Sequence, residues 1–163
     1  MMSKNKSYRI FGFIFSFLSF YTIYKLRIDY DYSLLLLIVI ICVSTDVGGY
    51  VFGKILKGPK LTKLSPNKTY AGMIGGYLLS IISLIILTDF YFNEELQIKW
   101  FIFVILISTI SQLGDIIISF FKRLSKIKDT GKIIPGHGGL LDRVDGMIFA
   151  FPFSYLIFLI DFL

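Results

Sequence analysis

Long apolar runs separated by short polar segments dominate the 163-residue chain. Windows near the length needed to cross about 30 Å of hydrocarbon lie at Ile10–Tyr24, Leu34–Phe52, Tyr70–Phe92, Trp100–Phe121 and Met147–Leu163. The pattern predicts an all-α fold, a polytopic integral membrane bundle of about five transmembrane helices. Because no repeat, low-complexity tract or long linker divides the chain, residues 1–163 are predicted to form a single membrane domain.

Composition places these runs in a bilayer. The mean hydropathy is +0.75 and only 17% of residues are charged, which is more apolar surface than a soluble core of this length buries. The first window follows basic residues as a signal peptide does, but no A-x-A-like cleavage site comes after it, so we predict an uncleaved span. The single cysteine, Cys42, lies within a predicted span, so disulfides play no part.

The distribution of basic residues predicts the orientation. With five spans and a cytoplasmic N-terminus, 14 of the 17 basic residues fall on the cytoplasmic side, and only Lys25, Arg27 and Lys99 fall on the other. The positive-inside bias therefore predicts a cytoplasmic N-terminus and an external C-terminus. Membrane orientation accounts for the net charge of +6, and nucleic acid is not expected as a partner.

Two aspartates lie where lipid is expected, Asp46 and Asp115. A carboxylate at that depth costs a few kcal/mol on insertion scales, so it is normally paired, hydrated or bound to a cation. Helical spacing puts one polar stripe on the face of Asp115, formed by Ser108, Gln112, Asp115, Ser119 and Lys122. The same spacing gives Asp46 a face of small residues that another helix or a ligand can approach. The structural alternative for both aspartates is an ion pair, with Lys122 or Arg123 as partner.

The first cytoplasmic loop ends in "SPNKTYAG". Ser65 can cap a helix there, Pro66 suits its first turn, and Lys68 and Thr69 are predicted to lie in that turn. A helix N-terminus favours phosphate, although a simple capped start to the third span explains the octet as well. Within that span, Ala71 with Gly75 and Gly72 with Gly76 have the four-residue spacing of close helix packing.

The second cytoplasmic loop ends in "PGHGGLLDRVDG". Asp142 and Asp145 project from one face if the fifth helix begins here, and paired carboxylates suit a hard cation such as Mg²⁺. The glycines upstream, Gly138 and Gly139 among them, let a ligand approach the main chain. His137 alone is more often a hydrogen-bonded loop residue than a catalyst.

The stretch "SFFKRLSKIKDTGKIIPGHGGLLDRVD", residues 119–145, resembles the signature of the phosphatidate cytidylyltransferases, also called CDP-diglyceride synthetases. The shared elements are S-x-x-K-R, K-D, P-x-H-G-G and D-R-x-D, in order and spacing. "STDVGGYVFGK", "SPNKTYAG" and "QLGD" resemble further family segments. The likeness covers about residues 44–146 and extends into the last helix, so the family-like catalytic region is about 44–163.

The resemblance implies a nucleotidyltransferase that makes CDP-diacylglycerol and pyrophosphate from CTP and phosphatidate, with Mg²⁺ and a possible second cation. It implies that Asp115, Asp142 and Asp145 hold the metal. The resemblance assigns contacts with phosphate to Lys122, Arg123 and Lys68. It places Ser65 and Thr69 at a helix start that also binds phosphate. The loop with Lys128, Asp129, His137, Gly138, Gly139 and Arg143 is expected to close over the nucleotide, and Asp46 is expected near the site.

Family members are usually longer, with additional N-terminal spans. The expected location is a bacterial cytoplasmic membrane, with the site facing the cytoplasm and phosphatidate drawn from membrane lipids. A homodimer is an assembly to test. The alternatives are a cation-coupled membrane transporter, a CTP-dependent lipid kinase, or a catalytically inactive family member lacking N-terminal helices. The transporter explains Asp46 and Asp115 but leaves the glycine loop unexplained.

Overall fold

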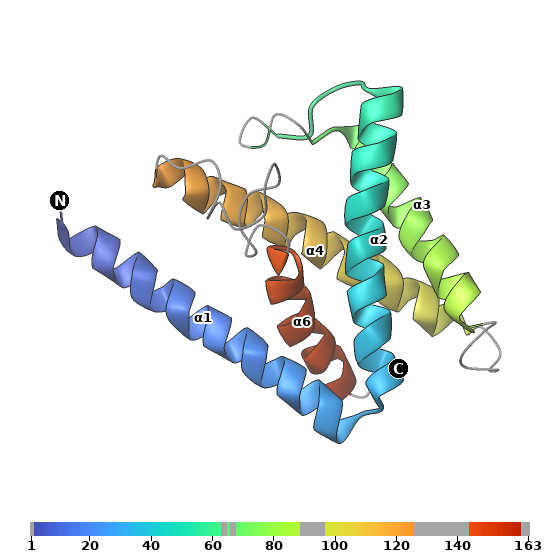
Figure 1. Cartoon of the computed structure of the whole chain (residues 1–163), viewed down its shortest axis with the longest axis horizontal. Helices are drawn as coiled ribbons and strands as arrows, with labels where there is room; N and C mark the ends of the chain where they lie inside the picture. Colours follow the sequence, from blue (N-terminus) through green and yellow to red (C-terminus); the bar gives the residue numbers. More distant parts are fainter. Residues whose placement is uncertain (1, 63–64, 66–67, 89–96, 126–143, 161–163) are drawn as a thin grey trace, which may run out of the picture.

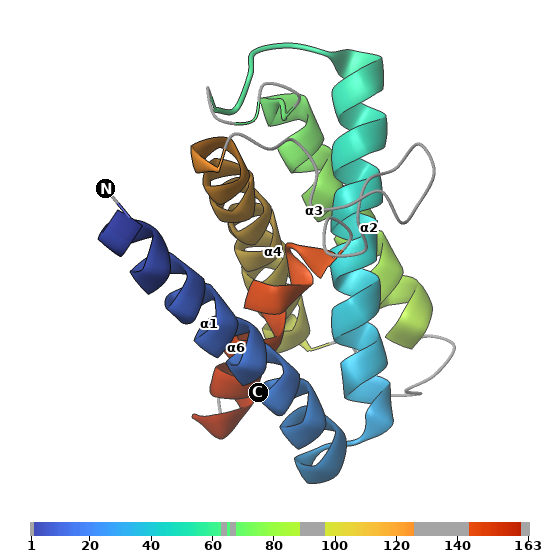
Figure 2. The ribbon, with the colours of Figure 1, turned by 60° about the vertical axis from the view of Figure 1, so that its left-hand side comes forward.

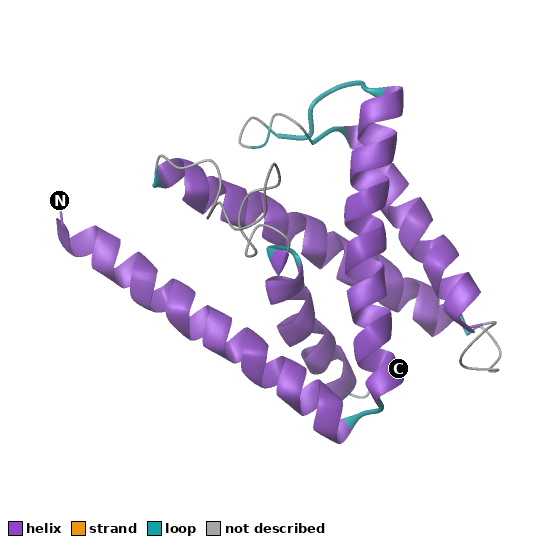
Figure 3. Ribbon diagram, in the orientation of Figure 1, coloured by secondary structure: helices purple, strands orange, loops and turns teal. Residues whose placement is uncertain are grey.

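The computed structural model describes residues 2–62, 65, 68–88, 97–125 and 144–160. In these segments the chain forms helices α1 (Met2–Asp29), α2 (Tyr32–Leu56), α3 (Tyr70–Leu87), α4 (Ile98–Leu124) and α6 (Met147–Leu159) (Figure 1). The described part holds no β-strand, only an isolated bridge between Lys60 and Thr69 (Figure 3). The prediction of an all-helical fold is confirmed.

Three of these helices, α2, α3 and α4, are long and apolar enough to cross a membrane. They coincide with the three central windows of the sequence pattern, and many of their large apolar side chains are exposed on the outer surface. Helix α6 is apolar but shorter, and α1 extends beyond its predicted window at both ends. The chain is therefore a membrane protein built on an α2, α3 and α4 framework.

Helices α2 and α3 touch through their backbones. They run side by side in both views (Figures 1 and 2). A Cβ added to Gly48 would clash with the carbonyl of Gly75, and one added to Gly72 would lie 2.5 Å from the carbonyl oxygen of Gly49. Only glycine permits this approach, so the predicted packing role of Gly72, Gly75 and Gly76 is confirmed.

Helix α6 lies between α1 and α4 (Figures 1 and 2). On the α4 side, Gly114 leaves room for the ring of Phe149. On the α1 side, the rings of Phe15 and Phe149 have centroids 4.6 Å apart. Aromatic packing therefore joins α6 to both neighbours and fixes the position of the chain just before it.

A proline in α6 creates the polar contact with α1. Pro152 lies inside the helix and has no N–H to donate to the carbonyl of Ile148, one turn earlier. That carbonyl accepts a hydrogen bond from Ser19 Oγ at 2.6 Å. The hydroxyl of Ser19, which is 2% exposed, thus takes the place of the missing backbone donor.

The third span begins at Tyr70, as its predicted window does, but the predicted helix cap at Ser65 is wrong. Helix α3 begins at Tyr70 with Thr69 as its N-cap, whose hydroxyl accepts from Gly72 N at 3.1 Å. Ser65 instead lies in a turn, where its carbonyl accepts from Lys68 N at 3.1 Å. A bond from Leu61 N to Lys68 O and the Lys60–Thr69 bridge pair the two ends of this loop, and the described helix begins only after Thr69.

Candidate functional site

A cavity of about 350 Å³ opens among α2, α3, α4 and the segment just before α6. The predicted site residues that line it are Asp46, Ser65, Lys68, Thr69, Asp115, Lys122 and Asp145. Four of the five residues of the polar stripe predicted from helical spacing line it, Gln112, Asp115, Ser119 and Lys122, whereas the fifth, Ser108, is fully buried. Residues far apart in the sequence therefore meet in one polar space between apolar helices.

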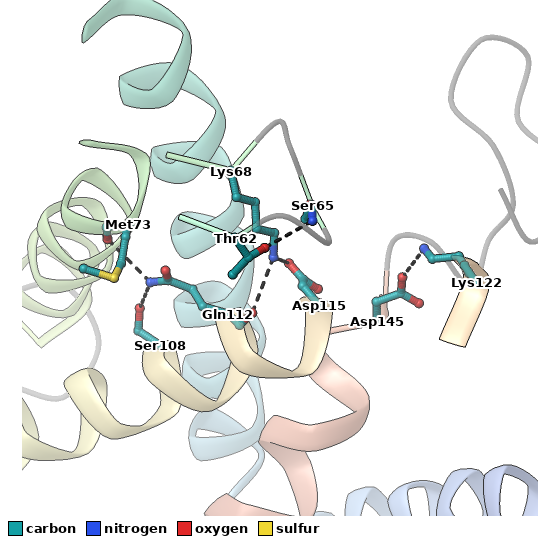
Figure 4. A network of polar contacts seen from close by, with 9 residues as sticks. All are labelled: Thr62, Ser65, Lys68, Met73, Ser108, Gln112, Asp115, Lys122 and Asp145. Carbon is teal, nitrogen blue, oxygen red and sulfur yellow. Dashed lines mark hydrogen bonds and ion pairs between the residues drawn. The ribbon is translucent and has the colours of Figure 1, made fainter. Parts of the chain in front are cut away.

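Lys68 joins the loop before α3 to α4. Its Nζ lies 3.0 Å from Asp115 Oδ2 and donates to the carbonyl of Gln112 at 3.4 Å (Figure 4). Both charged side chains are about a quarter exposed, at 28% and 22%. The partner of Asp115 is thus Lys68, and not Lys122 or Arg123 as the structural alternative had it.

Lys122 reaches from the last turn of α4 to the segment before α6. Its Nζ lies 2.7 Å from Asp145 Oδ2, and the two side chains are 13% and 6% exposed (Figure 4). This is a short, charge-assisted hydrogen bond in a largely buried setting. Asp145 precedes α6, because the helix begins at Met147 with Gly146 in the N-cap position.

Gly146 brings the two carboxylate-bearing segments together. A Cβ at this position would lie 3.0 Å from Asp115 Oδ1 and would clash with the hydroxyl of Ser111. Glycine therefore lets the backbone next to Asp145 sit directly against α4. The result is that Asp115 and Asp145 face the same cavity from different segments.

Asp46 contributes a third carboxylate, from α2. Its exposed side chain faces the cavity and interacts electrostatically with Asp115 and Asp145. Three carboxylates and two lysines, Lys68 and Lys122, are the charged groups among the described cavity residues. By formal count, the described lining therefore holds three acidic and two basic side chains.

Uncharged polar groups support this lining. Gln112 Nε2 donates to the carbonyl of Met73 and to Ser108 Oγ, both at 3.5 Å (Figure 4). Thr45 Oγ1 donates to the same Ser108 oxygen at 2.9 Å. These contacts link α2, α3 and α4 beneath the charged groups, so the cavity floor is cross-linked by hydrogen bonds.

Other predicted site residues are placed elsewhere or not described. Arg123 is exposed and does not line the cavity. Lys128, Asp129, His137, Gly138, Gly139, Asp142 and Arg143 lie outside the described residues. Among the residues with described placement, no three His, Cys, Asp or Glu side chains form a group that could hold a metal ion. The predicted triad includes Asp142 and is thus not tested.

Sequence reasoning missed Tyr50, which lines the cavity and is exposed. Its position four residues after Asp46 puts it on the same face of α2. The four-residue spacing from Asp46 was the signal that could have identified Tyr50 as a site residue. It was overlooked because tyrosine is common near the ends of membrane helices.

The chain is similar to known proteins along most of its length. A model of the cytidylyltransferase family matches residues 3–161. Proteins named phosphatidate cytidylyltransferase are 44% identical over 110 residues in Staphylococcus haemolyticus, 44% over 119 in Bacillus subtilis and 43% over 111 in Staphylococcus aureus. The names of these relatives do not favour the alternative that the chain is a cation-coupled transporter.

The matched segments make up 66%, 70% and 66% of this chain, and 42%, 43% and 42% of the respective relatives. The chain thus corresponds to less than half the length of the relatives it matches. The family model, in contrast, covers nearly all of the chain, including every residue that lines the cavity. The chain therefore belongs to the cytidylyltransferase family.

Proposed function

We propose that this protein is a membrane-bound nucleotidyltransferase that transfers CMP from CTP to phosphatidate, giving CDP-diacylglycerol and pyrophosphate. Its relatives carry the name phosphatidate cytidylyltransferase. The observation that carries the proposal is the meeting of Asp46, Asp115 and Asp145 with Lys68 and Lys122 in one cavity. Such a mixture of carboxylates and ammonium groups is suited to polyanionic substrates and a cation.

The reaction requires neutralisation of the substrates' negative charge rather than a strong general base. The attacking group is a phosphate monoester, whose second pKa is about 6, so it is largely ionised near neutral pH. Its oxygen forms a bond to the α-phosphorus of CTP while the bond from that phosphorus to the bridging oxygen breaks, and pyrophosphate leaves with the electron pair. The protein must hold two polyanions in line and offset their charge.

The carboxylates fit a hard divalent cation such as Mg²⁺. Asp115 and Asp145 offer oxygen ligands, and we propose Asp142 as a further ligand with Asp46 in support. The gathering of three acidic side chains in the described lining favours binding of a cation. When bound, such a cation supplies charge neutralisation to the phosphates and to the leaving pyrophosphate.

The lysines have a second role once a polyanion is present. In the substrate-free protein Lys68 and Lys122 neutralise Asp115 and Asp145. Both ammonium groups line the cavity, so phosphate oxygens placed there can accept hydrogen bonds from them. Lys68 immediately precedes the N-cap of α3, and the positive end of that helix's dipole also favours phosphate.

The remaining predicted residues complete the proposal. We assign contacts with the nucleotide to Lys128, Asp129, His137, Gly138, Gly139 and Arg143, and an outer phosphate contact to Arg123. Five spans with a cytoplasmic N-terminus put the cavity on the cytoplasmic side of a bacterial inner membrane. Support comes from Lys54 in the last turn of α2 and from Lys122 and Arg123 in the last turn of α4, of which Lys122 lines the cavity.

The test is product formation by the full chain in detergent or nanodiscs. With labelled CTP, phosphatidate and Mg²⁺, we expect a lipid-soluble CDP product and release of pyrophosphate. Asp115→Asn should abolish most of it. The matched control is Asp31→Asn, which removes the same charge from the N-cap of α2, where asparagine also caps well. Absence of product from the unmodified chain would overturn the proposal.

A further inference from the structure

A stripe of three exposed residues runs along α2 from the cavity to the outside. Asp46, Tyr50 and Lys54 follow one another at four-residue intervals and so share one helix face. Asp46 and Tyr50 line the cavity, while Lys54 lies in the last turn of the helix. Tyr50 is nevertheless 68% exposed. It therefore stands at the rim, where the cavity meets the surface.

Lys54 is held over this rim by Tyr50. Its Nζ lies 5.5 Å from the centroid of the Tyr50 ring and donates a hydrogen bond to the Tyr50 hydroxyl at 3.4 Å. The ring attracts the ammonium group through its π face. The ammonium group is thus held beside the side chain of Tyr50, which lines the cavity.

The surface beside this rim is apolar. Val47 and Val43, about one and two turns before Tyr50 on the same side of α2, are 49% and 45% exposed. Exposed aliphatic side chains on a membrane helix face lipid, while tyrosine and lysine near its end lie at the headgroup level. The rim therefore opens toward lipid headgroups.

We propose that Tyr50 and Lys54 form the opening through which an anionic phosphomonoester lipid reaches the cavity, with Lys54 binding its phosphate first. The inference rests on the proposed function and names the route of its lipid substrate. A doubly charged phosphomonoester is attracted to the ammonium group more strongly than a zwitterionic phosphodiester headgroup. The Tyr50 hydroxyl can then donate to the same phosphate.

This is a capture role and not a catalytic one. At 1.5 Å of rise per residue, Lys54 lies about 12 Å along the helix from Asp46. A phosphate bound at Lys54 must still move about two helical turns to reach the carboxylates. Loss of Lys54 should therefore weaken lipid binding and raise the KM for the lipid, with little change in kcat.

The experiment measures lipid binding directly, without nucleotide. The full chain is placed in nanodiscs of phosphatidylcholine with increasing phosphatidate, and bound phosphatidate is counted by native mass spectrometry. We expect Lys54→Gln to weaken binding about fivefold and Lys54→Arg to restore it, because arginine keeps the charge. Lys57→Gln is the control, since it removes an equal charge from an exposed residue outside the cavity lining.

Several outcomes would overturn the inference. Equal binding by Lys54→Gln and the unmodified chain is one, and failure of Lys54→Arg to restore binding is another. A raised KM for CTP instead of the lipid would assign Lys54 to the nucleotide. Displacement of phosphatidate by an equal concentration of glycerol 3-phosphate would show a site for free phosphate rather than for lipid.

The inference and the proposed function can fail separately. If the chain forms CDP product but Lys54→Gln binds and uses phosphatidate as the unmodified chain does, only the inference falls. If no product forms while phosphatidate binding still depends on Lys54, the inference stands and the proposed function falls.

Discussion

Single side chains in the cavity differ in how deeply they are buried, and this separates two aspartates that look alike in the sequence. Asp145 is largely buried with Lys122, whereas Asp115 and Lys68 are partly open to solvent. Removing one member of a buried ion pair strands the other charge in a medium of low polarity. At a partly exposed pair, water can solvate the charge that remains, so the same change costs less stability.

We therefore expect Asp145→Asn to lower stability as well as activity. The variant removes from Lys122 its 2.7 Å contact with a largely buried carboxylate, and breaking a buried ion pair costs up to about 3–5 kcal/mol. Thermal unfolding in detergent should show a clearly lower Tm, and Lys122→Met combined with Asp145→Asn should recover part of the loss. An unchanged Tm for the single variant would argue that water already reaches the pair.

Asp115→Asn should separate activity from stability. We expect turnover to fall at least about 100-fold, because a charged site group is lost, while the Tm stays near that of the unmodified chain because the pair with Lys68 is partly exposed. Steady-state kinetics and thermal unfolding on the same preparation test this. A large fall in Tm would favour a purely structural ion pair.

Local spacing predicted which residues of α4 share a face, but not which charges pair. The stripe from Gln112 to Lys122 follows from helical geometry alone. The partner of Asp115 is 47 residues away, on a loop whose path depends on the Lys60–Thr69 bridge. Such pairs are set by tertiary contacts, so the sequence offered several lysines and no means to choose among them.

At the scale of elements, apolar windows located the helices better than capping signals located their ends. Ser65 and Thr69 can both cap a helix, and the sequence favoured the first because proline follows it. The backbone of Lys68 bonds instead to Leu61 and Ser65, and the cap of α3 is Thr69. A tertiary hydrogen bond in the preceding loop thus accompanies the choice of Thr69 rather than Ser65 as the cap of α3.

The bond between α1 and α6 gives a prediction at this scale. Ser19→Ala should destabilise the protein by about 1–2 kcal/mol, because the carbonyl of Ile148 loses its donor. Adding Pro152→Ala should restore stability, since the new backbone N–H can bond to that carbonyl within the helix. Unfolding of both variants measures the effect, and an additive loss would contradict this account.

At the scale of the whole molecule, composition and hydropathy predicted an all-helical membrane protein, and family signatures predicted its relatives. The cavity itself was not predictable. Its walls come from α2, α3, α4 and the segment before α6, and their closeness depends on glycine contacts that only the folded chain reveals. Tyr50 became visible as a cavity residue only in this arrangement.

Topology can be tested with the native cysteine in place, because Cys42 is fully buried and gives little background. Lys60→Cys should react with an impermeant maleimide only from the cytoplasmic side. Gln97→Cys, at the exposed N-cap position of α4, should react only from the outside. Labelling of intact cells against inverted vesicles distinguishes the two sides, and the reverse pattern would contradict the predicted orientation.

The backbone contact between α2 and α3 also limits how the cavity can change shape. Interfaces made of side chains adapt by switching rotamers, but one in which Gly48 meets Gly75 has no such freedom. The two helices must then shift as one stiff wall, carrying Asp46 with them. Any widening or narrowing of the cavity during turnover therefore falls to α4 and to the segment before α6.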